Sequence, residues 1–226
     1  MKRITVILIF IFASSSFAQT NFRLNDASKA VDVELEVGPC EDDYSSMCKL
    51  AVRFFRKRGK TPFQTIRLPR SGIWDNPPKA NVTRRYDDQS TVNFEDFNFD
   101  GSEDIAICDG TNGGYGMPSY RVYLYSKGNK RFKFSRSFTR MNEGGLGMFE
   151  TDKKKRMHFV FTKSTCCWHQ TQGFDVVRGQ PRKVYELTED GVTPWIANRG
   201  LVEITTSKLI KGRWRTWVKR VKRTGQ

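Results

Sequence analysis

The sequence predicts an all-β protein, an antiparallel meander with a compact propeller-like or sandwich-like shape. Short runs of apolar and aromatic residues recur along the chain, separated by turns of glycine, asparagine, aspartate and lysine. No segment carries a long apolar stripe with helical spacing. The 17 phenylalanines, 7 tyrosines and 5 tryptophans are typical of a strand-built core.

The N-terminus has the pattern of an export signal. Met1-Lys2-Arg3 is positively charged, the apolar run Ile4 to Ala13 follows, and Ser16-Phe17-Ala18 places small residues at a cleavage point. We therefore predict a signal peptide over residues 1–18, cleaved after Ala18, with an apolar run too short to anchor the chain in a bilayer. No cysteine follows the cut, so we do not expect a lipoprotein.

Residues 19–226 are predicted to form a single all-β domain in the periplasm or outside the cell. No other long apolar stretch exists, so no transmembrane segment is expected. The whole chain has a formal charge of +15, and removing Lys2 and Arg3 from an acid-free leader leaves +13. A basic excess suits an anionic envelope surface or an acidic protein partner, and export argues against nucleic acid.

Ten segments carry strand signals before the C-terminal region. Val31–Val37 alternates apolar and acidic residues, which is the period of a half-buried strand. Pro69–Gln89 contains a double proline and mixed charges, and is expected to be an irregular connection. The predicted strands are Val31–Val37, Leu50–Phe55, Pro62–Leu68, Val92–Phe94, Ile105–Cys108, Tyr120–Tyr125, Arg131–Phe134, Met157–Phe161, Phe174–Val177 and Lys183–Leu187.

The C-terminal stretch from Lys208 has eight basic residues and no acid. Trp214, Trp217 or Val218, and Val221 fit one face of a helix, which would suit an amphipathic basic helix on an anionic membrane. Leu201–Thr205 and Lys211–Val218, around a turn at Ser207–Ile210, equally fit a last β-hairpin. The strand signals of the preceding chain favour the hairpin, with Lys219–Gln226 as a basic tail.

Five cysteines in an exported chain predict disulfides. Cys40 and Cys48 flank a polar loop between two predicted strands and are expected to close its mouth. Cys108, Cys166 and Cys167 remain, and one thiol must be left over. Adjacent cysteines can bond only through a strained turn, so Cys108 with Cys166 or Cys167 is the less strained alternative. These residues alone leave both pairings open.

A calcium loop is predicted between two strands. Asp96, Asn98, Asp100, the carbonyl of Ser102 and Asp104 offer oxygens at relative positions 1, 3, 5, 7 and 9, and Gly101 permits a sharp turn at position 6. Position 12, where an EF-hand has glutamate, is an isoleucine within an apolar run, so the loop joins strands and not helices. The alternative is a turn rich in aspartate and asparagine that binds no ion.

The next loop, Asp109 to Tyr120, contains four glycines and Tyr115. It is either a long turn with Tyr115 folded onto the core or a protruding recognition loop, because loops on rigid strands often carry binding and tyrosine is a frequent anchor. It lacks the sequence of a phosphate loop.

The other candidate chemical cluster is Cys166-Cys167-Trp168-His169. It offers three zinc ligands at poor spacing, and export favours oxidised sulfur over a thiolate. No nucleophile–base pair or paired-carboxylate motif is recognisable outside the calcium loop. The protein is therefore predicted not to be an enzyme.

Together these motifs resemble a known family. Asp96–Asp104 is similar to the calcium loop of FG-GAP-type β-propeller repeats. That loop, the run from Tyr115 to Tyr125, the Gly147-Met-Phe-Glu segment and Cys166-Cys-Trp-His occur in the order seen in a bacterial envelope family. Its characterised relative is an immunity protein against a lysozyme-like peptidoglycan hydrolase delivered by a type IV secretion system, and the family is related to periplasmic lysozyme inhibitors.

The resemblance covers about residues 92–187 and implies a calcium-containing all-β inhibitor with Ca2+ as its cofactor. It implies a Cys166–Cys167 bond, with Cys108 as a buried thiol. The Gly113–Tyr120 loop would enter a hydrolase cleft, with Tyr115 as the plug. Ser119 or Tyr120 would be polar contacts, and Trp168 and His169 a flank. The characterised relative is a lipoprotein, whereas this chain lacks the lipid-acceptor cysteine. Many lysozymes are basic, so the partner of a +13 protein should carry an acidic face.

The alternative hypothesis is a basic module that binds envelope glycan or lipopolysaccharide. Trp214, Trp217 and the basic tail would carry that activity.

Overall fold

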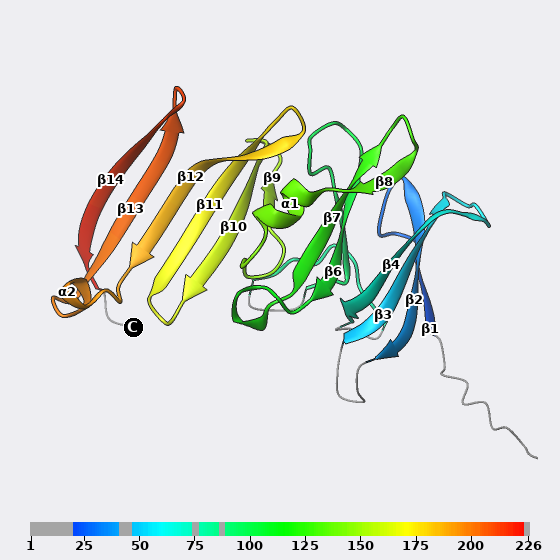
Figure 1. Ribbon diagram of the computed structural model, residues 1–226, viewed down its shortest axis with the longest axis horizontal. Coiled ribbons are helices and arrows are strands. Elements are labelled where there is room, and N and C mark those ends of the chain that lie inside the picture. The colour runs from blue at the N-terminus through cyan, green and yellow to red at the C-terminus, as the bar shows by residue number, and fades with distance from the viewer. Residues whose placement is uncertain (1–19, 41–46, 74–76, 86–88, 224–226) are drawn as a thin grey trace, which may run out of the picture.

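Antiparallel strands make up most of the structure, which confirms the predicted all-β class. The computed structural model describes residues 20–40, 47–73, 77–85 and 89–223. The predicted signal peptide and the last residues of the predicted tail lie outside these ranges. Three sheets follow one another along the chain (Figure 1).

Each sheet is a meander in which strand order follows chain order. The first contains β1 (Thr20–Leu24), β2 (Val31–Cys40), β3 (Met47–Arg56) and β4 (Pro62–Gly72). The second contains β5 (Val92–Glu95), β6 (Asp104–Gly110), β7 (Ser119–Ser126) and β8 (Arg131–Phe134). The third contains β9 (Glu150–Asp152), β10 (Met157–Ser164), β11 (Trp168–Val177), β12 (Gln180–Asp190), β13 (Leu201–Ile210) and β14 (Arg213–Lys222).

Three short helical segments interrupt the strands. They are η1 (Gly114–Gly116), α1 (Arg136–Met141) and α2 (Pro194–Ala197). Among the residues described, no helix is long and apolar enough to cross a membrane.

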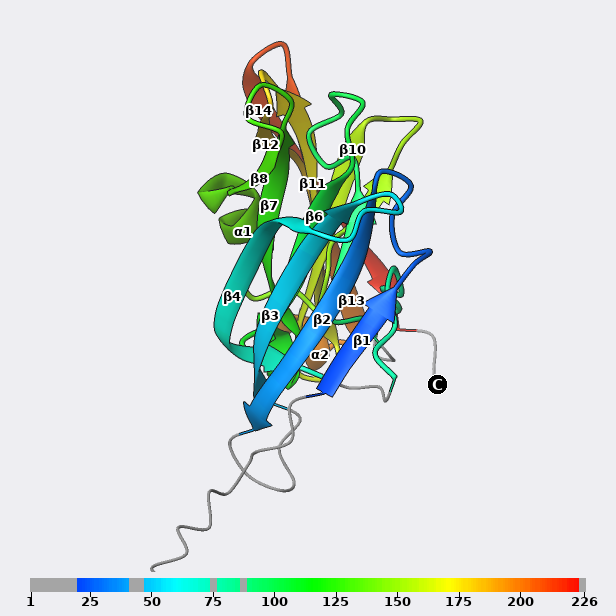
Figure 2. The same ribbon diagram turned by 90° about the vertical axis from the view of Figure 1, so that its right-hand side faces the viewer.

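Two apolar cores hold the layers together. The first lies between the first and second sheets and includes Leu35, Phe54 and Ile105. The second includes Phe97 and Phe138 and lies between the other face of the second sheet, α1 and β10. Figure 2 looks along this stack, with β1–β4 in front of the other strands. The sheets are thus layered as in a sandwich and form no closed barrel. The β13–β14 hairpin contributes no residue to either core.

The last two strands confirm the predicted hairpin, but its turn is displaced. The turn is Lys211-Gly212, both with positive φ (50° and 75°), which matches the twist of the flanking strands. The predicted turn at Ser207–Ile210 is therefore wrong. Lys219–Lys222 belongs to β14, so the predicted tail begins too early.

Other boundaries also differ from expectation. β1 and β9 were not predicted, and neither was α1. β4 continues through Gly72 into the segment expected to be irregular. These differences leave the meander order unchanged.

The Cys40–Cys48 disulfide predicted from the sequence and the Cys166–Cys167 disulfide implied by the family resemblance are both present. Cys40 pairs with Cys48 across β2 and β3, with an S–S distance of 2.01 Å. Cys166 is bonded to Cys167 at the β10–β11 turn. This selects the vicinal pairing over the Cys108 alternatives, and Cys108 is a fully buried thiol on β6.

Candidate functional site

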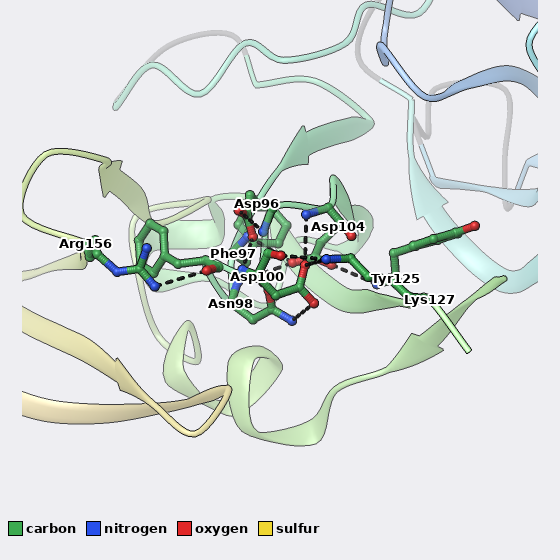
Figure 3. Close-up of polar contacts among 11 residues, drawn as sticks. Asp96, Phe97, Asn98, Asp100, Asp104, Tyr125, Lys127 and Arg156 are labelled. Atoms are coloured by element: carbon green, nitrogen blue, oxygen red, sulfur yellow. Dashed lines mark hydrogen bonds and ion pairs between the residues drawn. The ribbon is translucent and has the colours of Figure 1, made fainter. Parts of the chain in front are cut away.

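The predicted calcium loop joins β5 to β6 and folds around its own side chains (Figure 3). The Asp96 carboxylate accepts hydrogen bonds from the backbone N–H groups of Asp100 (2.9 Å) and Gly101 (2.8 Å). Asn98 Oδ1 accepts a further bond from Asp100 N, and Asp100 Oδ1 accepts one from Ser102 N. Gly101 has φ +85°, a conformation that glycine adopts without strain. The side chains at positions 1, 3 and 5 are therefore held by the backbone of the loop itself.

Asp104 has a different role from the other predicted ligands. It is fully buried, and three backbone N–H groups donate to its two oxygens: Phe97 (2.9 Å) and Asn98 (3.3 Å) to Oδ2, and Tyr125 (2.7 Å) to Oδ1. Burial raises the pKa of Asp104 to about 7, although the three N–H bonds act to lower it. This carboxyl group fixes the shape of the loop and links it to β7.

Two basic side chains close the outer side of the loop. Lys127 Nζ donates to the carbonyl of Asp100 (2.7 Å) and lies 3.8 Å from its Oδ1. Arg156 donates to the carbonyl of Phe99 (3.0 Å). Across the described ranges, no group of three or more histidine, cysteine, aspartate or glutamate side chains is arranged to hold a metal. The side chains at positions 1, 3 and 5 carry oxygens of the type that a hard cation prefers and are exposed or half-buried, although these oxygens also accept backbone N–H bonds. Asp104, by contrast, is fully buried.

His158 lies behind this loop and is a core residue. It is fully buried and stacks on Phe99, with ring centroids 5.0 Å apart. Its Nε2 lies 2.7 Å from the carbonyl of Phe97, and its Nδ1 lies 3.1 Å from Thr151 Oγ1. Burial lowers the pKa of His158 to about 4. The imidazole is therefore neutral at physiological pH, and it packs against Phe99 of the loop.

A groove of about 840 Å³ opens between the loop at residues 96–104 and the β1–β2 connection. Glu103 crosses one side of it, where its carboxylate accepts bonds from Ser28 Oγ (2.7 Å), Lys29 N (2.9 Å) and Ala30 N (3.2 Å). On the other side, Lys153 pairs with Glu95 at 3.0 Å. The Glu103 contacts join the loop to the β1–β2 connection, and the Lys153–Glu95 pair joins β5 to the β9–β10 turn.

Tyr115 protrudes from the second candidate loop, in the short helical turn η1. Its side chain is 61 % exposed. Its backbone is left-handed (φ 57°, ψ 32°), a region that costs a residue with a Cβ atom about 1–2 kcal/mol. The predicted protruding loop is thus present, and the alternative, with Tyr115 folded onto the core, is not what the structure shows.

The base of this loop is held by backbone contacts. Gly113 N donates to the carbonyl of Met117 and Gly114 N to that of Gly145, both at 2.9 Å. A Cβ atom at Gly113 would come within 2.6 Å of the Met117 carbonyl oxygen, so this position is packed too closely for a side chain. Ser119 Oγ donates to Asp109 Oδ1 (2.7 Å). The loop is consequently anchored at both ends.

The β10–β11 turn lies against Tyr115. The Tyr115 hydroxyl accepts a hydrogen bond from Thr165 N, and Lys163 Nζ lies 5.0 Å from the centre of the ring. Thr165 directly precedes the Cys166–Cys167 bond, which therefore also lies beside the loop. Lys163 and Thr165 were not predicted as site residues, because no local signal in the sequence indicates that this turn reaches Tyr115.

The predicted flanking pair, Trp168 and His169, is divided between two faces of the sheet. His169 is the cross-strand partner of Lys163, so their side chains share the face on which Tyr115 lies. Trp168 is the neighbouring residue in the same strand and therefore points to the opposite face. The structure therefore places His169 on the face of the sheet that carries Lys163, and Trp168 on the other face.

The two residues predicted as polar contacts, Ser119 and Tyr120, differ from each other in exposure. Ser119 is half-buried at the loop base, where it bonds Asp109. Tyr120 is only 2 % exposed, and its hydroxyl donates to the Ser90 carbonyl (2.8 Å). Burial raises the pKa of Tyr120 well above its ordinary value. The prediction that Tyr120 contacts a partner is wrong, because its side chain belongs to the second core.

Comparison with known proteins identifies a shared fold. No protein-family model and no curated protein sequence matches the chain. A solved structure, described as a type IV secretion system related protein of Xanthomonas, superimposes with a TM-score of 0.69 at 20 % identity. The match covers 89 % of this chain and 97 % of that one. At this identity the similarity establishes the fold, which extends well beyond the residues 92–187 of the sequence resemblance.

Proposed function

We propose that this protein is a non-catalytic exported inhibitor, similar to an immunity protein, that blocks a peptidoglycan hydrolase associated with type IV secretion. The observation that carries the proposal is Tyr115, an exposed aromatic ring on a strained backbone in a tethered loop. The fold shared with a type IV secretion system related protein supports the proposed association with type IV secretion.

An inserted plug needs a rigid support, because an ordered loop loses less conformational entropy on binding. The hydrogen bonds of Gly113, Gly114 and Ser119 supply that support, and the Thr165 N–H group orients the ring. Tyrosine suits the role because it offers a large contact area with few rotatable bonds.

The charge beside the ring also suits a glycan-cleaving enzyme. Glycoside hydrolases commonly use a pair of carboxyl groups in the cleft. Lys163 accompanies Tyr115 and could approach those carboxylates, with His169 on the same face. The +13 charge of the exported chain would favour a hydrolase with an acidic surface around its cleft.

The test is a pull-down with the exported chain (residues 19–226) against periplasmic and secreted proteins at physiological salt, followed by a cell-wall clearing assay. We expect one hydrolase to be recovered stoichiometrically and inhibited. Tyr115→Ala should abolish inhibition while the protein stays folded by circular dichroism. Phe134→Ala is the matched control, because Phe134 is also an exposed aromatic (52 %) but lies on β8. Full inhibition by Tyr115→Ala would refute the assignment of the loop.

We further propose that the loop at residues 96–104 binds calcium and stiffens the scaffold next to the inhibitory loop. Asp96, Asn98, Asp100 and the Ser102 carbonyl are the proposed ligands. Asp104 is retained as a fifth candidate, whose N–H contacts assign it a structural role first.

Calorimetric titration with Ca2+, and with Mg2+ for comparison, tests this proposal. Asp96→Asn should abolish calcium binding, because it removes a ligand charge. Asp175→Asn, which removes an exposed carboxylate that pairs with Arg182 on the third sheet, should leave it unchanged. Absence of calcium binding by the unmodified chain would refute the cofactor proposal without affecting the inhibitor test.

A further inference from the structure

The C-terminal hairpin exposes the edge of the third sheet along the full length of β14. Every described residue of this strand is exposed, including Trp214 (45 %), Trp217 (49 %) and Val218 (54 %). Other described sheet edges are shorter or covered: β1, β5, β8 and β9 have five residues or fewer, and β4 packs against β6. Figure 1 shows the hairpin at the end of the molecule farthest from β1–β4.

The pairing of β13 with β14 identifies the outward-facing backbone groups. Ile210 and Arg213 flank a two-residue turn, and Arg223 N donates to the Gly200 carbonyl (2.8 Å). Both observations give the same alternation of hydrogen-bonded and non-hydrogen-bonded pairs. The residues whose N–H and C=O groups point away from β13 are Trp214, Thr216, Val218, Arg220 and Lys222.

The side chains of β14 restrict what can pair with this edge. The strand contains five basic residues and no acidic one: Arg213, Arg215, Lys219, Arg220 and Lys222. A second copy of β14 would bring two such sets together, and like charges on adjacent strands are destabilising. Basic residues alone could serve only to keep the edge unpaired. The exposed tryptophans and valines do not fit that purpose, because they offer apolar contact area.

The distribution of these side chains favours an added strand over a membrane. One face carries Trp214, Val218, Arg220 and Lys222, and the other carries Arg213, Arg215, Trp217, Lys219 and Val221. Each face therefore holds a tryptophan, a valine and basic residues. A bilayer would engage one face and would require an apolar face segregated from a charged one. An added strand meets side chains on both faces and also pairs the outward backbone groups.

We propose that β14 binds an extended, acidic peptide segment of a partner protein by β-strand addition. The edge backbone would supply the hydrogen bonds, the basic residues would select acidic side chains, and Trp214 and Trp217 would cover the added strand from both faces. This surface is separate from the Tyr115 loop, and the inference does not depend on the inhibitor function.

The test uses the full exported chain and a blocked ten-residue peptide of glutamate, threonine and valine, with glutamate at positions that would face the basic residues of β14. Binding is followed by tryptophan fluorescence and by amide hydrogen exchange. We expect saturable binding that weakens with salt, and new protection at the amides of Trp214, Thr216, Val218, Arg220 and Lys222. The same peptide with glutamine for glutamate should bind at least about tenfold more weakly. A peptide N-methylated at alternate residues keeps the charges but loses the backbone donors, and should also bind about tenfold more weakly.

Two protein variants separate backbone pairing from charge. Thr216→Pro removes one outward N–H group, and should weaken binding about tenfold. Thr216→Val is the matched control: it removes the same hydroxyl contact to Ser207 (2.8 Å) but keeps the N–H group, and should bind as the unmodified chain does. Thermal unfolding confirms that both variants are folded.

Three results would overturn the proposal. They are equal binding of the N-methylated peptide, peptide binding without alternating amide protection, and failure of the acidic peptide to bind while phosphatidylglycerol vesicles do. Tyr115→Ala should leave peptide binding unchanged, so failure of the inhibitor proposal and failure of this one are distinguishable.

Discussion

Replacing Tyr115 by glycine should separate the contribution of this residue to folding from its contribution to binding. The left-handed backbone at this position costs tyrosine about 1–2 kcal/mol, and glycine adopts it without that cost. Glycine loses about 0.5–1 kcal/mol more in backbone entropy on folding, so the strain relief is partly offset.

The contacts that the substitution removes are few. The hydrogen bond with Thr165 N contributes about 0.5–1.5 kcal/mol. The exposed cation–π contact with Lys163 contributes about 0.5–1 kcal/mol. The ring is 61 % exposed, so its burial adds little. We therefore expect Tyr115→Gly to lower the free energy of unfolding by only about 1 kcal/mol.

The effect on inhibition should be much larger. Truncating a central aromatic anchor typically costs at least about 2 kcal/mol, which corresponds to about a 30-fold loss of affinity. Urea unfolding measures the first quantity, and titration of hydrolase activity measures the second. Tyr115→Phe is the control that keeps the ring and loses only the bond to Thr165. A stability loss above about 3 kcal/mol, or inhibition within threefold of the unmodified chain, would refute the assignment of Tyr115 as a binding residue.

Three other expectations concern the scaffold. Gly147→Ala should lower the free energy of unfolding, measured with urea, by about 2–4 kcal/mol, because the added Cβ would lie 1.9 Å from Nε2 of buried Gln89. Gly179→Ala is the control: Gly179 has a similar positive φ but open space around it, so the loss should be only about 1 kcal/mol. The unfolded chain protonates His158 first as pH falls, because the folded-state pKa is about 4 against 6.5. His158 should therefore contribute a loss of about 3 kcal/mol between about pH 6.5 and pH 4, opposite in sign to the contribution of Asp104, whose folded-state pKa is raised to about 7. Urea unfolding of the unmodified chain and of His158→Gln over this pH range gives the His158 contribution as the difference between the two. Lys127→Met should tighten calcium binding about fivefold, because it removes a positive charge 3.8 Å from Asp100 Oδ1. Calorimetric titration measures the affinity, and an unchanged or weaker affinity would contradict the proposed cation position.

The strand order could be predicted from the sequence because it follows local signals, whereas the missed strands depend on pairing. β9 consists of Glu150, Thr151 and Asp152, with no apolar residue to mark it. It is a strand because β10 binds alongside it, with Met157 opposite Asp152. The displaced turn before β14 has a local cause: Lys211-Gly212 supplies two residues with positive φ, a requirement that glycine at the second position meets.

In the candidate site, too, the features set by local contacts could be predicted and those set by distant contacts could not. Residue type and spacing were sufficient to locate the loop oxygens, because the hydrogen bonds of Asp96, Asn98 and Asp100 are local. The orientation of Asp104 depends on the N–H group of Tyr125 in another strand, which spacing alone does not reveal. Tyr120 follows the glycine-rich loop directly in sequence, but it is buried because α1 and β10 cover that face of β7.

The charges that make up the net +15 are unevenly distributed over the protein, which affects both proposed binding surfaces, the Tyr115 loop and the β14 edge. The groove beside the loop at residues 96–104 is bordered by Glu95, Asp96 and Glu103; Glu95 pairs with Lys153, while Asp96 and Glu103 accept hydrogen bonds from backbone N–H groups. The basic residues of β14 have no such density of acidic neighbours, and Arg220 with Glu203 is the ion pair described there. The long-range field of the protein should therefore attract an acidic partner most strongly toward the hairpin. Contact at the Tyr115 loop depends instead on shape and on Lys163, so the two surfaces can select different partners or different parts of one partner.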